Sequence, residues 1–493
     1  MHKITVIGGS ASGVIAAGLA KAHWGPHVQV TLIYDHKNPG IGVGESLTPQ
    51  IYRFLDMLDI TREDMIKNVN ATVKLGLKFK NWLNDGKYYY HGFNHINYAN
   101  SALAAGYDII HDRYTGGSQY DFSYYENSVI PDNTKPYSSK EIIGGESLHI
   151  DATLFSKYIE QRIKNDIEIV DDVVLDVIKN GDNIESIVLE KGGKHTADFY
   201  IDASGFATVL YKHMGSTWVD KSDWLPINRC IPNPVPVAFT KQPTYTTSEA
   251  TDNGWILQVP LQNRWGSGYL YSSQFTSDEE AFDKFNIWRL KNYASEVPVT
   301  SKILKFKSGY WKESWRGNCI AVGLACGFTE PLEATNIHHT VTQLFDFFTL
   351  YNLVPLEIDR KAYNKQQTEM LENIYLYLRF CYTTGRTDSE FWKYMTNSTP
   401  DTVKYIEEKI KLFHLVDQDI SGNVIFKTEN FTAVAVGLKK PNPENIKRIT
   451  KLRNAFDIAK ADSEWLRKIK INEKLRLIDH KQYINSVLNR DTL

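Results

Sequence analysis

Residues that could act chemically are gathered in the stretch 327–336, which reads Gly-Phe-Thr-Glu-Pro-Leu-Glu-Ala-Thr-Asn. Its two carboxylates, Glu330 and Glu333, precede a segment with helical spacing, and Thr335 or Asn336 is suited to cap the first turn of that helix. A helix N-terminus attracts anions because its N–H groups are free. The stretch therefore predicts an anion site with an acid beside it. An ordinary capped helix with two surface glutamates is the alternative.

A second candidate is the alternating segment 72–82, which predicts a β-strand. One face of this strand would carry Val73, Leu75, Leu77 and Phe79, and the other Thr72, Lys74, Gly76, Lys78 and Lys80. A face with three lysines is usually solvated. One of these amines could act on a substrate only if the face looks into a cavity.

The elements that would position a ligand begin at the N-terminus. An apolar strand at residues 4–7 runs into a glycine-rich loop and then into a helix of small residues at 14–23. The loop consists of Gly8, Gly9, Ser10, Ala11, Ser12 and Gly13, so a serine replaces the middle glycine of the G-x-G-x-x-G pattern. A second strand at 28–34 ends in Asp35, about twenty residues past the loop. This arrangement predicts a dinucleotide site, with pyrophosphate at the helix N-terminus and a ribose hydroxyl on Asp35.

Three further residues are candidates for contacts with a ligand. Glu45 lies in the glycine-rich stretch 40–46, whose backbone is suited to pass close to a flat molecule. His91 and His95 have a spacing that would allow a metal, but no cysteine accompanies them, so we expect no metal. Trp255, like most buried tryptophans, is more often part of a core than of a binding site. His91 and Trp255 are kept as candidate substrate contacts.

Composition narrows the class of protein. The chain has 493 residues and a formal net charge of −2, so no global field would draw it to nucleic acid or anionic lipid. Its four cysteines, Cys230, Cys319, Cys326 and Cys381, have no metal-like spacing and favour a reducing compartment. No apolar segment reaches the length of a membrane span. We therefore expect a soluble, cytoplasmic protein that acts on small molecules, with a homo-oligomer left open.

In combination, the motifs resemble those of flavin-dependent halogenases of the tryptophan-halogenase type. The resemblance covers most of residues 1–440. The segments that carry it are the 8–13 loop, Gly44-Glu45-Ser46, the 73–79 strand, Asp202-Ala203-Ser204-Gly205-Phe206, the 254–260 strand and the 327–336 stretch.

The resemblance implies an α/β fold with an FAD-binding, Rossmann-like core of the aromatic-hydroxylase kind, a large β-sheet insertion and a helical C-terminal region. The FAD-binding module would occupy residues 1–350, with inserted segments at about 80–140 and 215–305 forming the substrate side. Residues 351–493 would be a mainly helical region that covers the substrate.

The resemblance also implies roles. Reduced FAD, O2 and a halide ion would form hypohalous acid, which Lys74 would direct at an electron-rich aromatic ring while Glu333 assists. Backbone around Thr335 and Asn336 would bind the halide, and Val173, Leu324 and Ile337 would touch FAD. The sequence holds no second glycine-rich motif for a nicotinamide, so a separate NAD(P)H-dependent flavin reductase would supply FADH2.

Two departures from the family pattern keep alternatives open. The W-x-W-x-I-P motif is Trp255-x-Leu257-x-Val259-Pro260 here, and a Ser-Thr-Gly sequence at the halide site is Ala334-Thr335-Asn336. We expect Asn336 to tolerate left-handed backbone in place of the glycine. An aromatic flavin monooxygenase and an inactive FAD-binding protein are the alternatives to a halogenase.

Overall fold

The computed structural model describes residues 1–38, 44–93, 128–129, 146–237, 239–293, 302–413, 415–452, 457–458, 460–461, 463–464 and 478–489. The chain divides into two compact units, each assembled from three stretches. Unit 1 consists of Met1–Ala71, Ile150–Ser222 and Phe306–Glu372. Unit 2 consists of Thr72–His149, Asp223–Lys305 and Asn373–Leu493.

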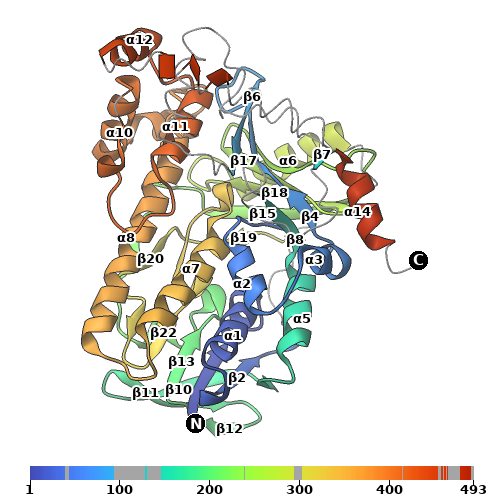
Figure 1. Cartoon of the computed structure of the whole chain (residues 1–493), viewed down its shortest axis with the longest axis vertical. Helices are drawn as coiled ribbons and strands as arrows, with labels where there is room; N and C mark the ends of the chain where they lie inside the picture. The colour runs from blue at the N-terminus through green and yellow to red at the C-terminus, as the bar shows by residue number, and fades with distance from the viewer. Residues whose placement is uncertain are drawn as a thin grey trace. The chain divides into compact units, whose positions relative to one another are not determined.

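Unit 1 is built on a six-stranded sheet in the order β21-β22-β13-β1-β2-β9. Figure 1 labels β22, β13 and β2 of this sheet. Its neighbouring strands are parallel except for the edge pair β21–β22. The strands are β1 (His2–Ile7), β2 (Val28–Tyr34), β9 (Glu168–Asp171), β13 (Phe199–Asp202), β21 (Trp315–Arg316) and β22 (Cys319–Ala321). Residues 4–7 of β1 are all buried, which suits a parallel sheet because both of its faces are covered.

The helices of unit 1 pack around this sheet. Helix α1 contacts β2, α5 and α7, and small side chains along it allow this close approach. The helices are α1 (Ala11–Trp24), α2 (Ile51–Met57), α3 (Arg62–Asn68), α5 (Ala152–Ile163) and α7 (Thr335–Leu350). Helix α8 (Glu357–Cys381) divides its residues between the two units.

Smaller elements complete unit 1. One sheet is the meander β10 (Val174–Asn180), β11 (Asn183–Leu189) and β12 (Gly193–His195), and another joins β14 (Trp218–Asp220), β20 (Gly309–Trp311) and β23 (Gly327–Phe328). Strand β3 is Gly44–Ser46, and the short 3-10 helices are η1 (Gly25–His27), η3 (Gly205–Ala207), η4 (Tyr211–His213), η5 (Gly323–Ala325) and η6 (Pro331–Glu333).

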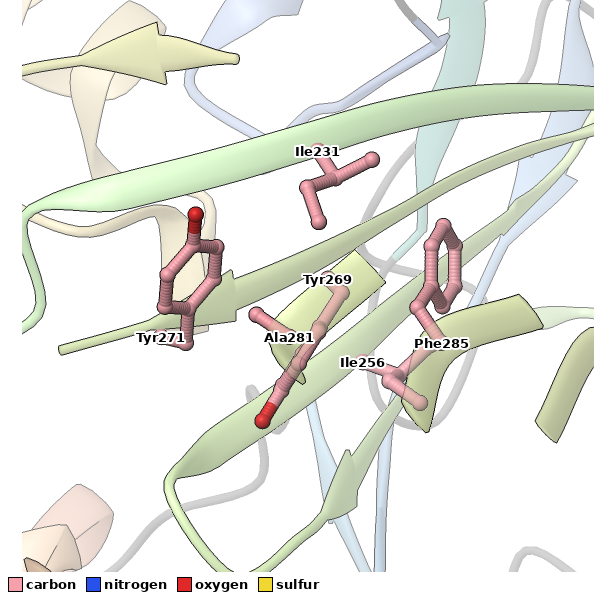
Figure 2. Close-up of a cluster of buried hydrophobic side chains, with 6 residues drawn as sticks. All are labelled: Ile231, Ile256, Tyr269, Tyr271, Ala281 and Phe285. Atoms are coloured by element: carbon pink, nitrogen blue, oxygen red, sulfur yellow. The ribbon is translucent and has the colours of Figure 1, made fainter. Parts of the chain in front are cut away.

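Unit 2 contains a seven-stranded sheet in the order β19-β15-β18-β17-β16-β5-β6, antiparallel except for the pair β16–β5. The strands are β5 (Gly76–Lys80), β6 (Tyr88–Gly92), β15 (Arg229–Pro236), β16 (Tyr245–Ala250), β17 (Gly254–Pro260), β18 (Arg264–Tyr271) and β19 (Leu304–Lys305). Helix α6 (Asp278–Tyr293) packs on one face. Figure 2 shows the buried cluster there, in which Ala281 and Phe285 of α6 lie against Ile231, Ile256 and Tyr269 of the sheet.

The C-terminal part of unit 2 is helical, with α9 (Glu390–Asn397), α10 (Asp401–Lys411), η7 (Asp417–Asp419), α11 (Thr428–Gly437), α12 (Pro443–Leu452) and α14 (His480–Leu488). A short pair joins β7 (Ser128–Val129) to β24 (Ile478–Asp479). The expected mixed α/β fold with a large sheet and a helical C-terminal region is confirmed. No helix in the described part of the chain is long and apolar enough to cross a membrane.

The prediction of one continuous strand at 72–82 is wrong, because the strand is interrupted at Leu75. The N–H of Leu75 donates to the carbonyl of Thr244 at 2.6 Å, and its carbonyl accepts from the N–H of Phe93 at 3.3 Å. Strand β4 (Thr72–Lys74) pairs antiparallel with β8 (Ser147–Asp151), whereas β5 lies in the seven-stranded sheet. Lys74 and Lys78 therefore lie in different sheets rather than on one face.

Close approach of backbone explains two glycines of the first loop. A Cβ on Gly13 would lie 1.7 Å from the carbonyl oxygen of Gly8, and one on Gly8 would lie 2.4 Å from the carbonyl oxygen of Ala203. Gly8 also has a φ of 120°, which L side chains rarely adopt. The contact of Gly8 with Ala203 holds the loop against the end of β13, the neighbour of β1 in the sheet.

We expect Gly13→Ala to lower the free energy of unfolding by roughly 3 kcal/mol, because backbone cannot yield as a side chain can. In an unhindered helix the same change would stabilise by about 1 kcal/mol, so the sign is diagnostic. Gly181→Ala is the control, since Gly181 has a φ of 60° and open space around it. It should cost only about 1 kcal/mol of conformational strain. Urea unfolding measures both, and a stabilised Gly13→Ala protein would contradict the packing.

Candidate active site

The carboxyl ends of the parallel strands in unit 1 meet at one edge of the sheet. Ile7 of β1 is the register partner of Asp202 in β13, and Asp202 is the partner of Ala321 in β22. The chain leaves β1 toward β2 on one side, while β13 lies on the other. Open α/β sheets bind nucleotides at such a switch point, outside the carboxyl ends of the strands.

The first turn of α1 lies at this edge and is suited to an anion. Ser10 is the N-cap residue, and within the described structure its side chain makes no capping hydrogen bond. The N–H groups of Gly13 and Val14 donate to the carbonyl of Ser10 at 2.9 and 3.1 Å. By helix geometry, the N–H groups of Ala11 and Ser12 have no acceptor within the helix. They remain available to a pyrophosphate.

The rest of the predicted loop supports this turn. A Cβ on Gly9 would lie 2.3 Å from the ring of Tyr34, so the loop packs on the end of β2. The hydroxyl of Ser12 lies 3.5 Å from that of Thr340 in α7.

Asp35 follows β2 and is held by its own loop. Its carboxylate accepts hydrogen bonds from the side chain of Asn38 at 2.6 Å and from the N–H of Lys37 at 2.9 Å. The Asn38 hydrogen bond is the largest cause that lowers the pKa of this carboxyl group, followed by the Lys37 N–H. Asp35 is therefore ionised at neutral pH and is chemically suited to accept hydrogen bonds from ribose hydroxyls.

Val173 follows β9 with its side chain 37% exposed. Its N–H donates to the Asp172 carboxylate at 2.8 Å, and its carbonyl accepts from the N–H of Glu190 at 2.9 Å. Because both backbone groups are engaged within the protein, the side chain is the part of Val173 best placed to touch a ligand.

Sequence reasoning missed the role of Asp202 at the tip of β13. This buried carboxylate accepts from the N–H and hydroxyl of Ser204, at 3.0 and 2.5 Å, and from the N–H groups of Leu210 and Tyr211, at 2.8 and 2.7 Å. Burial raises the pKa of Asp202, and these hydrogen bonds oppose the rise. The sequence signal for this role was an aspartate at the end of an apolar strand, followed by Ala203-Ser204-Gly205. Such a carboxylate can accept hydrogen bonds from the loop that follows it.

The 327–336 stretch buries both of its carboxylates, and it differs from expectation at the helix start. Glu330 is 0% and Glu333 3% exposed, so they are not the surface glutamates of the alternative interpretation. Helix α7 begins at Thr335, and its N-cap residue is Ala334. Ala334, with a φ of 59°, takes the left-handed backbone that we expected of Asn336. Ala334 directly follows the 3-10 turn Pro331–Glu333, and this turn determines which residue takes the left-handed conformation.

A small polar cluster surrounds the start of α7. The hydroxyl of Thr329 lies 3.0 Å from that of Thr335 and donates to the side-chain oxygen of Asn336 at 3.3 Å. Among the described residues no side chain caps this helix. The free N–H groups at the N-terminus of a helix favour the binding of an anion. Ile337 is buried in the same turn, and Leu324 is half-buried in η5.

Lys74 lies in unit 2 and is 0% exposed. Its Nζ atom lies 4.7 Å from the centroid of the Phe93 ring, within the range of a cation–π contact. The other two lysines of the segment differ. Lys78 is half-buried over the rings of three tyrosines, Tyr88, Tyr90 and Tyr245, at 4.0, 5.5 and 5.0 Å, and Lys80 pairs with Glu249 at 3.0 Å. Burial thus singles out Lys74.

The weaker candidates fall into the protein interior. His91 is buried, with Nδ1 3.2 Å from the hydroxyl of Tyr377 and Nε2 3.4 Å from the amide of Asn430. His95 lies outside the described residues, and no metal-binding cluster occurs among the residues that are described. Trp255 is 0% exposed, on the face of β17 opposite Ile256. In β3, burial raises the pKa of Glu45 to about 7.

Comparison with known proteins gives consistent matches. A family model described as tryptophan halogenase matches residues 3–454. The 7-chloro-L-tryptophan 6-halogenase KtzR of Kutzneria sp. (strain 744) is 28% identical over 429 residues, 79% of this chain and 81% of the relative. The tryptophan 7-halogenase RebH of Lentzea aerocolonigenes is 28% identical over 453 residues, 84% of this chain and 82% of the relative.

A solved structure shares the fold. Tar14, a tryptophan C-6 flavin-dependent halogenase (chlorinase) from taromycin biosynthesis, superposes with a TM-score of 0.87 at 23% identity, over 99% of this chain and 100% of the other.

Buried neutral histidines predict an acid-labile protein. Burial lowers the pKa of His339 and of His480 to about 4, from an ordinary value of 6.5. Between these values the unfolded chain binds more protons than the folded one, so the free energy of unfolding falls as pH falls from 6.5 to about 4. Each histidine contributes roughly 3 kcal/mol of this loss.

Urea unfolding across this pH range measures the slope. Nε2 of His339 donates one hydrogen bond to the side-chain oxygen of Gln367 at 3.2 Å, and a glutamine can also donate such a bond. His339→Gln should therefore remove this residue's share of the slope. An unchanged slope in that variant would show that His339 titrates normally.

Proposed function

Because the chain belongs to the tryptophan halogenase family, whose members are FADH2-dependent halogenating enzymes, we propose that it halogenates an electron-rich aromatic ring, an indole or a phenol, through hypohalous acid directed by Lys74. The observation that carries this proposal is the burial of Lys74, which sets it apart from Lys78 and Lys80. An amine withdrawn from water is suited to meet a reagent that water would destroy.

The residues at the carboxyl edge of unit 1 fit FAD. The first turn of α1 would hold the pyrophosphate, and Asp35 would accept hydrogen bonds from the ribose. Glu45, Val173, Leu324 and Ile337 are proposed as further contacts. Reduced FAD, when bound, supplies the electrons with which O2 and halide are converted to hypohalous acid. The purified chain would receive FADH2 from a separate NAD(P)H-dependent flavin reductase.

The start of α7 would bind the halide. The N–H groups that follow Ala334 carry the positive end of the helix dipole. A chloride or bromide ion needs donors without a competing carboxylate cap. Since no side chain caps α7 within the described residues, this requirement is met.

Lys74 and Glu333 are proposed to carry the halogenation step. The Lys74 amine would donate a hydrogen bond to the oxygen of hypohalous acid and so hold the halogen toward the ring. A carboxylate such as Glu333 can stabilise the cationic ring intermediate and accept its proton. Removal of both groups from bulk water limits loss of the oxidant to other targets.

Relatives point to the first substrates to try. KtzR and RebH are named for action on 7-chloro-L-tryptophan and tryptophan, so tryptophan and related indoles lead the panel. The second tryptophan of the W-x-W-x-I-P motif is Leu257, which keeps an aromatic flavin monooxygenase as the second candidate.

Halide dependence separates the two candidates. With an added flavin reductase, NADH and FAD, we expect mass spectrometry to detect halogenated indole or phenol in chloride, bromide or iodide, with the isotope pattern identifying the halogen. A hydroxylated product that forms equally without halide would establish the monooxygenase instead. The chain alone should consume no NADH at the rate of turnover, since FADH2 comes from the reductase.

Replacement of Lys74 tests the directing amine. Lys74→Ala should reduce halogenated product roughly a hundredfold or more, because the loss removes a group that acts in the chemical step. FAD affinity should stay within about twofold, since Lys74 lies in unit 2 and the proposed FAD residues in unit 1. Lys78→Ala is the matched control, a lysine from the same segment that contacts tyrosines instead. Equal losses in the two variants would remove Lys74 from its proposed role.

A further inference from the structure

The strand that carries Lys74 has an open edge, and a histidine from the C-terminal helix closes it. Strand β4 lies at the edge of its sheet. The N–H of Val73, the residue before Lys74, donates to Nε2 of His480 at 3.0 Å. His480 opens α14 and is 0% exposed. A buried backbone N–H without an acceptor would be costly, so this contact holds β4 in place.

The hydrogen bonds determine where the proton of His480 lies. A backbone N–H can only donate, so Nε2 of His480 must be the acceptor. The proton is therefore on Nδ1, which lies 3.2 Å from the carbonyl oxygen of Gln242 and donates to it. Burial lowers the pKa of His480 to about 4, which keeps this neutral tautomer at neutral pH.

A second histidine fastens β4 at Thr72. The Thr72 hydroxyl donates to the carbonyl of Pro260 at 2.6 Å, so its oxygen accepts from Nδ1 of His149 at 3.0 Å. Nε2 of His149 then accepts from the Thr246 hydroxyl, also at 3.0 Å. His149 is buried, and its pKa is well below the ordinary value, chiefly because of burial and then because of the charge of Lys74.

We propose that His480 and His149 are positioning residues for Lys74, two neutral imidazoles that fix the backbone on which the amine is mounted. The proposal rests on the proposed function of Lys74. A long, flexible side chain can present its amine reproducibly only if its Cα is fixed. Neutral imidazoles fix the Cα without adding positive charge beside the ammonium group.

The C-terminal helix is thereby given a role in the reaction, although it lies beyond residues 3–454, which the family model matches. Its buried residues His480, Tyr483, Ile484 and Val487 follow helical spacing on one face. Asp479 caps the helix by accepting from the N–H of Gln482 at 3.0 Å, and Lys481 donates to the carbonyl of Phe239. These contacts place His480 against Val73.

The kinetic test compares three variants of α14 in the full chain with added reductase. We expect His480→Leu to lower kcat for tryptophan or the best indole of the panel by roughly ten- to a hundredfold, with KM and FAD affinity unchanged within about twofold. His480→Gln, which keeps an acceptor for Val73, should recover kcat to within about threefold of the natural protein. Gln482→Ala, on the exposed face, is the control. Natural kcat in His480→Leu, alongside a Lys74→Ala variant that is inactive, would overturn the positioning role.

A spectroscopic test does not depend on turnover. With histidine labelled uniformly with 15N, long-range proton–nitrogen spectra should show His480 and His149 as neutral Nδ1–H tautomers, assigned from the spectra of His480→Gln and His149→Gln. The amide of Val73 should be strongly protected from exchange, and its protection should fall in His480→Leu. An Nε2–H tautomer of either histidine, or a freely exchanging Val73 amide, would refute the positioning role of these histidines, even if Lys74 proves essential. Full activity of Lys74→Ala with both tautomers as expected would instead refute the proposed function.

Discussion

The amine of Lys74 lies where water does not reach, and this places demands on every group around it. A lysine ammonium that loses its hydration shell is destabilised relative to the neutral amine unless its neighbours compensate. The Phe93 ring presents its negative face at 4.7 Å, and the two histidines beside β4 are held neutral by burial. Lys78, half in water over three tyrosines, faces no such demand.

A second constraint, free helix N-termini, recurs in unit 1. Helix α1 starts just after the carboxyl end of β1, and helix α7 starts just after the turn Pro331–Glu333. Among the described residues neither start is capped by a side chain. At α1 the packing of Gly8 and Gly13 brings the turn close to β13, while at α7 the left-handed Ala334 reverses the chain just before the helix. The same partial charge would serve a pyrophosphate at one helix and a halide at the other.

Local sequence pattern was sufficient to predict the strand, glycine-rich loop and helix at the N-terminus. The strand expected at 28–34 has the bounds of β2, and the glycine-rich segment follows β1 as expected. The helix expected at 14–23 begins earlier, at Ala11, so that residues 11–13 of the expected loop form the first turn of α1. These features depend on apolar runs and glycines within about thirty residues of each other, where sequence pattern is most informative. The large sheet and the helical C-terminal part of unit 2 were expected from the family resemblance.

The features that the sequence did not predict depend on contacts between residues far apart in the chain. The break at Leu75 follows from hydrogen bonds to Thr244 and Phe93, which the alternation of residues 72–82 cannot reveal. The left-handed residue was assigned to Asn336 from its intrinsic preference, but the preceding turn places it at Ala334. His480 was missed because Val73 lies 407 residues away. The helical spacing of His480, Tyr483, Ile484 and Val487 was the one signal, since it predicts a histidine on a buried face.

The segment Trp255–Pro260, which departs from the W-x-W-x-I-P motif at Leu257 and Val259, also contacts the strand that carries Lys74. Strand β17 ends at Pro260, whose carbonyl accepts the Thr72 hydroxyl and so belongs to the anchoring of β4. A backbone carbonyl offers the same acceptor whatever side chains stand at 257 and 259. The exchange of a second tryptophan for Leu257 therefore leaves this link to the Lys74 strand intact. Trp255 remains in the core.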